Sequence, residues 1–170
     1  MNIYEADYNF LLKYFWPHKI HPKADTLGIL GNNQFGGRKG HQTHDIAFIN
    51  ELIMEYHRIT HTTLAITQHD NRACFDRTVP NITSLCNQRA GIPKKIYSLV
   101  NTIRKNTKYY TSTKDGVSHE PYYHHKTSPV YGSGQGSGNA GSEWNFISVP
   151  LMQTLEQLSD GCEITDPTKK

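Results

Sequence analysis

Cysteine is scarce in this sequence. The 170 residues include three cysteines, Cys74, Cys86 and Cys162, which are an odd number without Cys-x-x-Cys spacing. This pattern argues against both a disulfide framework and a cysteine-rich zinc site. We therefore expect a reducing, intracellular compartment, either cytoplasm or nucleus, rather than secretion.

Long apolar runs are also missing. No stretch approaches the roughly 20 apolar residues that cross a bilayer, so we expect neither a membrane-spanning role nor a membrane partner. The apolar, aromatic segment 8–16 follows Glu5 and Asp7, whereas a signal peptide carries positive charge at that place. This composition predicts a core or docking segment.

Net charge is small. Eighteen Lys and Arg against 15 Asp and Glu give +3, which permits a nucleic-acid partner without requiring one. The hydrophobic fraction of 36% and mean hydropathy of -0.64 are low for a globular domain. Ten Tyr, six Phe and two Trp nevertheless argue against a disordered chain. We expect a single domain, or a fragment of a larger one.

The first half of the chain predicts a loop, a helix and a strand. Residues 17–43 are rich in Pro, Gly, Lys and His, which indicates a loop or β-ribbon. Apolar residues at helical spacing then predict a helix that starts at Thr43 or Asp45, ends near His61 and packs one face on a sheet. The β-branched, alternating segment 62–69 predicts a strand that carries Asp70 at its carboxyl end.

The second half predicts three helices and a hairpin. Pro80 to Arg89 forms a helix closed by Gly91, and a second helix spans residues 93–106. Residues 108–123 form a hairpin, because Asp-Gly supplies the positive φ angles of a tight turn. A glycine-rich loop at 132–141 precedes a final apolar helix.

Asp70 is the strongest candidate for chemistry. A carboxylate at the end of a rigid strand suits magnesium, which tolerates little deviation from octahedral oxygen geometry. In Asp70-Asn-Arg-Ala-Cys-Phe-Asp76 a second carboxylate follows six residues later. The alternative is a capping Asp beside a surface Asp.

The glycine loop is a second candidate site. In Gly132-Ser-Gly-Gln-Gly-Ser-Gly138 the lack of side chains lets backbone amides and Gln135 approach a nucleotide closely. The loop also satisfies G-x-G-x-x-G, with Asp160 at a tolerable distance for a ribose-binding acid. No βαβ pattern surrounds it, however, which argues against dinucleotide binding.

Histidine offers weaker signals. His57 and His61 have the i, i+4 spacing of zinc metalloproteases, but Arg58 occupies the place of the general-base Glu. They are better interpreted as exposed helix residues. No covalent nucleophile can be assigned from the Ser, His, Cys and Asp residues.

Three segments, taken in order, resemble successive blocks of the reverse transcriptases of non-LTR retrotransposons and group II introns. Residues 34–45 resemble the fingers block Q-x-G-F-R-x-G-x-S-T, with Gly37 in place of Phe. Residues 70–76 resemble the metal-binding block D-x-x-x-A/C-F-D, and residues 131–137 resemble the P-Q-G-S block. The resemblance extends from about residue 28 to residue 158.

The resemblance implies a role for each matched residue. Asp70, with the carbonyl of Asn71 as an added ligand, would bind magnesium, which manganese can replace. Phe75 would lie under the sugar and reject a ribose 2′-OH. Arg38 and Lys39 would neutralise the triphosphate. Gln135 and Gly136 would line the nascent base pair, whereas Asp76 would be a structural partner.

The resemblance is incomplete at the carboxyl end. No Y/F-x-D-D sequence occurs between Trp144 and Lys170, no thumb follows, and Ala140-Gly141 stands where many relatives have Ser-Pro. The expected fold is α+β: the fingers and partial palm of a right-hand polymerase, as one partial domain over 1–170. Within it, 1–61 is fingers-like, 62–158 palm-like and 159–170 a tail.

The implied function is that of a reverse transcriptase fragment, a nucleotidyltransferase inactive alone because a two-metal site needs carboxylates from both blocks. Its implied partners are an RNA template and primer, deoxynucleoside triphosphates, and the missing palm and thumb portion of the polymerase.

The alternative is a non-catalytic module that binds RNA or DNA. Basic residues beside two tyrosines fit contact with a nucleic-acid backbone plus base stacking. The residues concerned are Lys94, Lys95, Arg104, Lys105, Lys108, Tyr109 and Tyr110. A solvated helix face explains this cluster equally well.

Overall fold

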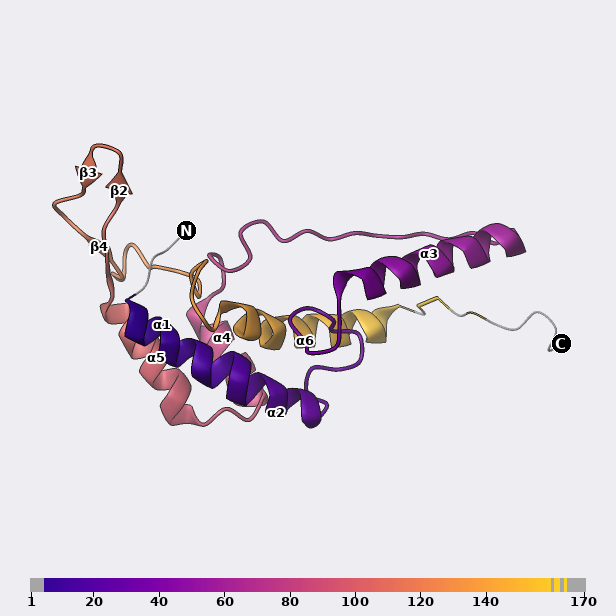
Figure 1. Ribbon diagram of the computed structural model, residues 1–170, viewed down its shortest axis with the longest axis horizontal. Coiled ribbons are helices and arrows are strands. Elements are labelled where there is room, and N and C mark those ends of the chain that lie inside the picture. The colour runs from indigo at the N-terminus through magenta and orange to yellow at the C-terminus, as the bar shows by residue number, and fades with distance from the viewer. Residues whose placement is uncertain (1–4, 160, 163, 165–170) are drawn as a thin grey trace.

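The computed structural model describes residues 5–159, 161, 162 and 164, and its elements are helices with two small antiparallel sheets (Figure 1). The helical elements are α1 (Ala6–Phe15), η1 (Trp16–Ile20), α2 (His21–Thr26), α3 (Thr43–Thr60), α4 (Pro80–Arg89), α5 (Lys94–Asn106) and α6 (Ala140–Leu158). The strands are β1 (Lys108–Tyr109), β2 (Ser112–Thr113), β3 (Gly116–Val117) and β4 (Tyr122–Tyr123). The mixture agrees with the expected α+β class.

The amino-terminal segment is a nearly continuous helical rod of α1, the π-helical turn η1 and α2. Glu5 starts it by accepting hydrogen bonds from the amides of Asp7 and Tyr8. The prediction of a loop or β-ribbon at 17–43 is therefore wrong for its first ten residues, 17–26. Pro17 and Pro22 each lie in the first turn of a helical segment, at the two junctions of the rod, and the turn between them is π-helical rather than α-helical.

One hydrophobic core joins the two halves of the chain. Leu12 and Trp16 of the rod are buried, so the predicted core or docking segment 8–16 contributes two residues to the core, while its other large apolar side chains, Phe10, Leu11, Tyr14 and Phe15, are exposed. The core cluster draws on the rod, α5 and α6; its buried members are Leu12, Trp16, Ala24, Leu30, Ile92, Tyr97, Val100, Phe146 and Val149. Residues 1–61 and 62–158 thus contribute to the same core.

Helix α3 has the predicted bounds but not the predicted packing. A capping box begins it, in which the side chain of Asp45 accepts from the Gln42 amide, and His61 ends it in the left-handed conformation with φ 54°. None of its 18 residues, all of them described, is buried. The expected packing of one face on a sheet is therefore wrong in this structure.

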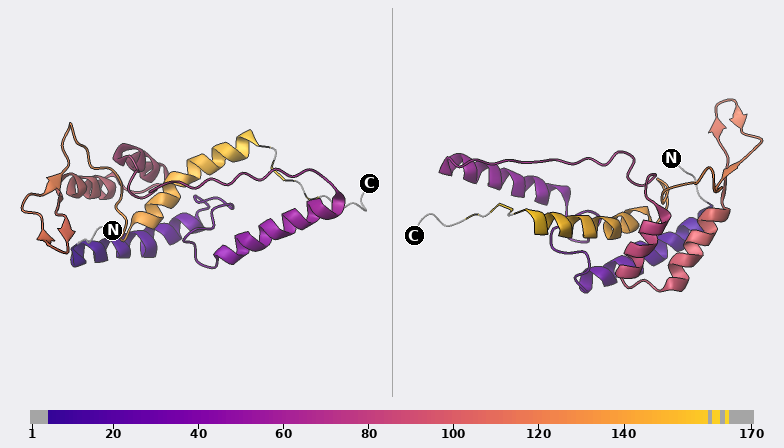
Figure 2. Two further views of the ribbon diagram at one scale, coloured as in Figure 1. Left: turned by 90° about the horizontal axis from the view of Figure 1, so that it is seen from above. Right: turned by 180° about the vertical axis from the view of Figure 1, so that it is seen from behind.

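Residues 62–69 do not form the predicted strand. The segment has no regular secondary structure and runs beside α3 back to the body of the molecule (Figures 1 and 2). A strand exists only where another strand supplies its hydrogen bonds, and the described residues supply none here. Residues 62–69 have the β-branched composition of a strand, but the predicted palm strand bearing Asp70 is wrong for the described structure.

The hairpin is confirmed as two short ladders. β2 pairs with β3 around the two-residue turn Lys114–Asp115, and β1 pairs with β4 below them. Gly116, the first residue of β3, has φ +132°, a conformation that favours glycine, whereas neither Lys114 nor Asp115 has a positive φ; of the expected Asp-Gly pair only the glycine adopts one. The ladders stand beyond the end of α5, and the chain then returns to the start of α6 (Figure 1).

Candidate functional site

Asp70 lies at the point where the irregular segment 62–69 meets the body of the molecule. A compact turn follows it, closed by hydrogen bonds from the amides of Asp76 and Arg77 to the carbonyl of Ala73, at 3.0 and 3.1 Å. Ala73 has φ 52°, an uncommon conformation for a residue with a side chain. Asp70 and Asn71 precede this turn, and both are exposed.

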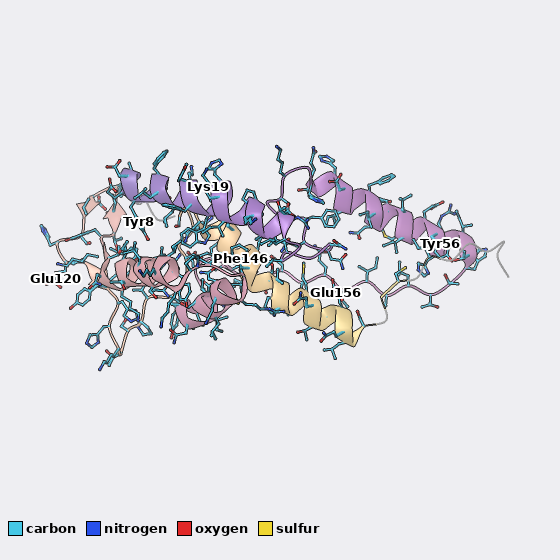
Figure 3. The ribbon with its side chains drawn as sticks, turned by 90° about the horizontal axis from the view of Figure 1, so that it is seen from below. Tyr8, Lys19, Tyr56, Glu120, Phe146 and Glu156 are labelled. Atoms are coloured by element: carbon cyan, nitrogen blue, oxygen red, sulfur yellow. The ribbon has the colours of Figure 1, made fainter. Side chains whose placement is uncertain are left out.

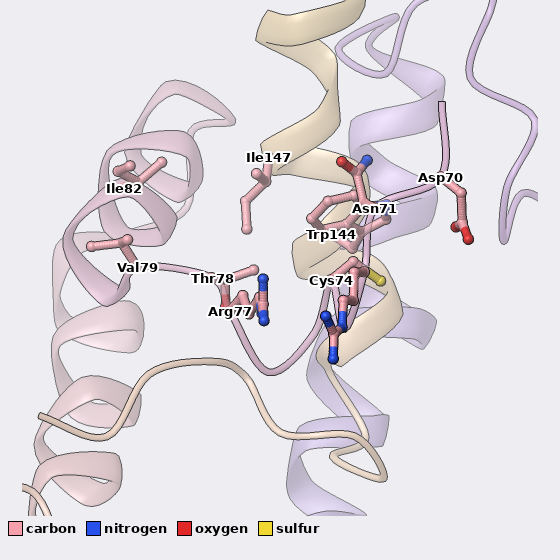
Figure 4. Close-up of a pocket in the computed structure, with 10 residues that line it drawn as sticks. Asp70, Asn71, Cys74, Arg77, Thr78, Val79, Ile82, Trp144 and Ile147 are labelled. Carbon is pink, nitrogen blue, oxygen red and sulfur yellow. The ribbon is translucent and has the colours of Figure 1, made fainter. Parts of the chain in front are cut away.

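A pocket opens between this turn, α4 and α6. Its volume is about 410 Å³, and its lining comprises Asp70, Asn71, Arg72, Cys74, Arg77, Thr78, Val79, Ile82, Trp144 and Ile147. Figure 4 shows Asp70 at one edge and Ile82 at the other, with Trp144 and Ile147 of α6 between them. The lining therefore includes one acidic residue, two arginines and an apolar wall, and in Figure 4 the Asp70 side chain is directed away from Trp144 and Ile147.

The glycine loop packs directly against the Asp70 turn. The amide of Gly132 donates to the Thr78 carbonyl and that of Ser133 to the Phe75 carbonyl, both at 2.8 Å. The amide of Gln135 donates to the Asp76 carboxylate at 3.0 Å. The structure thus brings together two segments that are about 60 residues apart, and Asp76 has the structural contact expected of it.

Two glycines of the loop are required by the chain's own backbone. A Cβ on Gly132, which has φ +92°, would lie 2.6 Å from the Phe75 carbonyl oxygen. A Cβ on Gly138 would lie 2.7 Å from the carbonyl oxygen of Asn9 in α1. Asn9 also holds the loop by accepting from the Gly138 amide at 2.6 Å.

Between these anchor points the top of the loop stays open. Gln135 and Gly136 are exposed, and neither lines the 410 Å³ pocket. The two segments are therefore in contact, but the pocket that Asp70 lines does not include Gln135 or Gly136, so a cleft shared by Asp70 and Gln135 stays a prediction. Phe75 is half-buried, with its ring 6.4 Å from that of Trp144 in an edge-on arrangement.

Residues 34–45, which resemble the fingers block, contact helix α6. Buried Gln34 donates to the Ser148 hydroxyl at 2.6 Å and accepts from the Gly36 amide at 2.9 Å. The Asn145 amide donates to the Gly36 carbonyl at 2.6 Å. All three segments singled out in the sequence therefore meet on the first half of α6.

Arg38 holds its own loop closed. Its guanidinium donates to the carbonyls of Gly31 and Gln34 at 2.6 and 2.8 Å, and it forms an ion pair with Asp25 at 2.6 Å. A triphosphate contact would have to replace these bonds. Lys39 is exposed. The triphosphate roles of both residues stay predictions.

A buried polar cluster was missed by sequence reasoning. Glu143 is 1% exposed and accepts from Arg104 of α5 at 2.7 Å, near the fully buried Asn139 at the start of α6. Burial raises the pKa of Glu143, and the charge of Arg104 and hydrogen bonds from Asn87 and Asn139 oppose the rise. One Glu in a helix carries no sequence signal for burial, because its partners come from other helices.

The carboxylate set does not complete a two-metal site. Across the described parts of the chain no three His, Cys, Asp or Glu residues cluster as metal ligands do. Asp70 and the Asn71 carbonyl could hold one magnesium ion with water, but Asp76 already accepts from the glycine loop. Asp160, considered as a ribose-binding acid, lies outside the described residues.

No helix of the described residues is both long and apolar enough to span a bilayer.

Comparison with known proteins found no family model, no curated protein and no solved structure that matches this chain.

Proposed function

We propose that this chain is a fragment of an RNA-directed DNA polymerase, comprising its fingers and part of its palm. The observation that supports it is the convergence on α6: the segments that resemble three reverse-transcriptase blocks lie far apart in sequence, yet each contacts or begins this helix. Phe75 packs on Trp144, Gly36 bonds to Asn145, and the glycine loop leads into Ala140.

In this proposal the pocket beside Asp70 receives the phosphates of a deoxynucleoside triphosphate. Asp70 would bind the accompanying magnesium ion, and Arg72 and Arg77 supply positive charge at the same pocket. Arg72 and Arg77, rather than Arg38, would neutralise the triphosphate, because the Arg38 guanidinium is bonded to its own loop and to Asp25.

The sugar and base would lie toward the glycine loop. Phe75 is adjacent in sequence to Asp76, whose carboxylate holds the amide of Gln135. The resemblance gives Phe75 the role of opposing a ribose 2′-OH; its half-buried ring packs edge-on against Trp144, and Phe75 does not itself line the pocket beside Asp70. The open backbone at Gly136 leaves room for a base.

The fragment alone should not polymerise. One carboxylate cannot hold the two metal ions of in-line nucleotidyl transfer, so we derive no catalytic step from the described residues. The exposed apolar side chains of α3, including Phe48 and Ile59 at 64% and 65% exposure, support a further portion of palm packed there. We propose that this portion carries the second carboxylate block.

Nucleotide binding tests the proposal. Fluorescently labelled dTTP should bind the wild-type chain weakly in the presence of magnesium, and removal of magnesium or the variant Asp70→Asn should abolish that binding. Asp115→Asn, in the exposed turn of the hairpin, removes the same charge elsewhere and should leave binding intact. Binding that ignores both magnesium and Asp70 would refute the proposal.

A further inference from the structure

The segment 107–131, which we call the tyrosine hairpin, exposes an unusual amount of aromatic surface. Its exposed tyrosines are Tyr110, Tyr122, Tyr123 and Tyr131, each 51% to 55% exposed. Figure 3 shows Glu120, within this segment, at the extreme end of the molecule, far from Tyr56 on α3. Rings so exposed contribute little to the core and are free to contact a partner.

The strand register sorts these side chains onto two faces. Tyr109 lies opposite Tyr122, and their rings are stacked, with centroids 5.0 Å apart and planes at 16°. Lys108 lies opposite Tyr123. Because successive residues of a strand point to opposite faces, the second face presents an ammonium group beside an aromatic ring.

The charge of this region is positive. Lys108, Lys114 and Lys126 lie within the tyrosine hairpin and Lys105 at the end of α5, against two acids, Asp115 and Glu120. Two of these lysines, Lys105 and Lys108, flank the start of β1. Aromatic rings interspersed with lysines are the combination that stacks bases and neutralises phosphates.

The geometry points to the tyrosine hairpin as a binding surface for single-stranded nucleic acid. One base stacks on Tyr123, on the face that carries Lys108, and another stacks on the exposed side of Tyr122, on the opposite face, where Tyr109 and Lys105 line one pocket. Lys108 and Lys105 contact the phosphates of these two bases. The lysines favour this polyanion over an apolar protein segment. The inference does not rest on the polymerase proposal, because none of these four residues lines the pocket beside Asp70.

The structure shows which residues of the basic cluster identified in the sequence lie near the tyrosines. Arg104 is engaged with Glu143. Lys94 and Lys95 start α5, and Lys105 lies near its end, about 15 Å away at a helical rise of about 1.5 Å per residue. Only the lysines at the end of α5 adjoin the tyrosines, so only those belong to the proposed surface.

Fluorescence anisotropy with labelled oligouridylate, a single strand without stable structure, tests this inference. Tyr122→Ser/Tyr123→Ser should weaken binding at least about fivefold for each base that stacks. Lys105→Gln/Lys108→Gln should reduce the slope of log affinity against log salt by about 1.4, because each single-strand phosphate contact contributes about 0.7.

Matched variants separate this surface from the other candidates. Lys94→Gln/Lys95→Gln removes the same charge at the other end of α5 and should retain the wild-type slope. Asp70→Asn should bind the oligonucleotide normally even if it abolishes nucleotide binding, so the two proposals fail separately. Equal losses in both lysine pairs, or no binding by the wild-type chain, would overturn the inference.

Ultraviolet cross-linking to the wild-type chain provides a test that does not depend on variant folding. Peptides carrying oligouridylate should map to residues 107–131. Cross-links concentrated on α3 or α1 instead would contradict the assignment.

Discussion

Glu143 is the residue whose environment differs most from what its chemistry prefers. It is a carboxylate with 1% exposure that meets Arg104 from α5 and the amide side chains of Asn87 and Asn139. These partners belong to α4, α5 and the end of the glycine loop. A buried ion pair adds little net stability but is costly to break, so this cluster fixes how the loop meets α6.

The raised pKa of Glu143 predicts a pH dependence of stability. The native state holds this proton above the ordinary pKa of 4.5, at which the unfolded state releases it. The contribution of Glu143 is therefore fully present below pH 4.5 and declines as pH rises through the raised pKa. Glu143→Gln retains an acceptor for Arg104 and removes this decline.

Urea unfolding of wild type and Glu143→Gln across the acid to neutral range measures the effect. The free energy of unfolding of wild type should fall relative to the variant as pH rises. Parallel curves would show that the pKa of Glu143 is the same in the native and unfolded states.

Gly132 supports a second prediction at the residue scale. Gly132→Ala should destabilise the chain by about 1–3 kcal/mol, because the new Cβ meets the Phe75 carbonyl at a strained backbone angle. Gly141→Ala is the control: it lies in α6 with nothing within 4 Å and should stabilise by about 0.5–1 kcal/mol. Thermal unfolding of the two variants measures the change in stability of each. Equal shifts of the melting temperature would contradict the close approach of a Cβ at position 132 to the Phe75 carbonyl.

At the scale of the element, the sequence predicted those helices whose ends are determined by residues within or next to them. Helices 80–89 and 94–106 follow from Pro80, Pro93 and Gly91, because these residues act on the backbone around them. The strand predicted at 62–69 is absent, because a strand needs a distant partner strand, and the described residues supply none. The helical turns at 17–26 were missed because two prolines in first-turn positions resemble loop composition.

The residues of the candidate site also fall into two groups: those that the sequence identified and those that only the structure reveals. Residues 70–76 and the glycine loop were singled out from residue type and order, and the structure places these two segments in contact, although residues 70–76 follow an irregular segment rather than the predicted strand. Arg72, Arg77 and the Glu143 cluster were missed, because their significance depends on which helices surround them.

Helix α3 exposes large apolar side chains to solvent and has no buried residue. Replacing Phe48 and Ile59 by Gln should change the free energy of unfolding by less than about 0.5 kcal/mol for each, because both are exposed. Self-association should fall, because the variant removes apolar contact area. Sedimentation velocity with urea unfolding measures both, and a large loss of stability would show that α3 is packed within the chain.

At the scale of the molecule, the chain consists of a body and an arm. The body holds the rod, α4, α5 and the start of α6 around the core; the arm is α3 with residues 62–69, extending away from it (Figures 1 and 2). The Asp70 turn lies where the arm rejoins the body. In the proposed polymerase, further palm structure would cover the arm and complete the metal site.

Paramagnetic broadening tests the central claim most directly. Manganese added with dTTP to the isotope-labelled chain should selectively broaden the amide resonances of Asp70 and Asn71, and more weakly those of Gln135 and Gly136. Asp70→Asn should abolish the effect. Broadening that is diffuse, centred elsewhere or unchanged in Asp70→Asn would contradict the account that the Asp70 turn and the glycine loop form one nucleotide site.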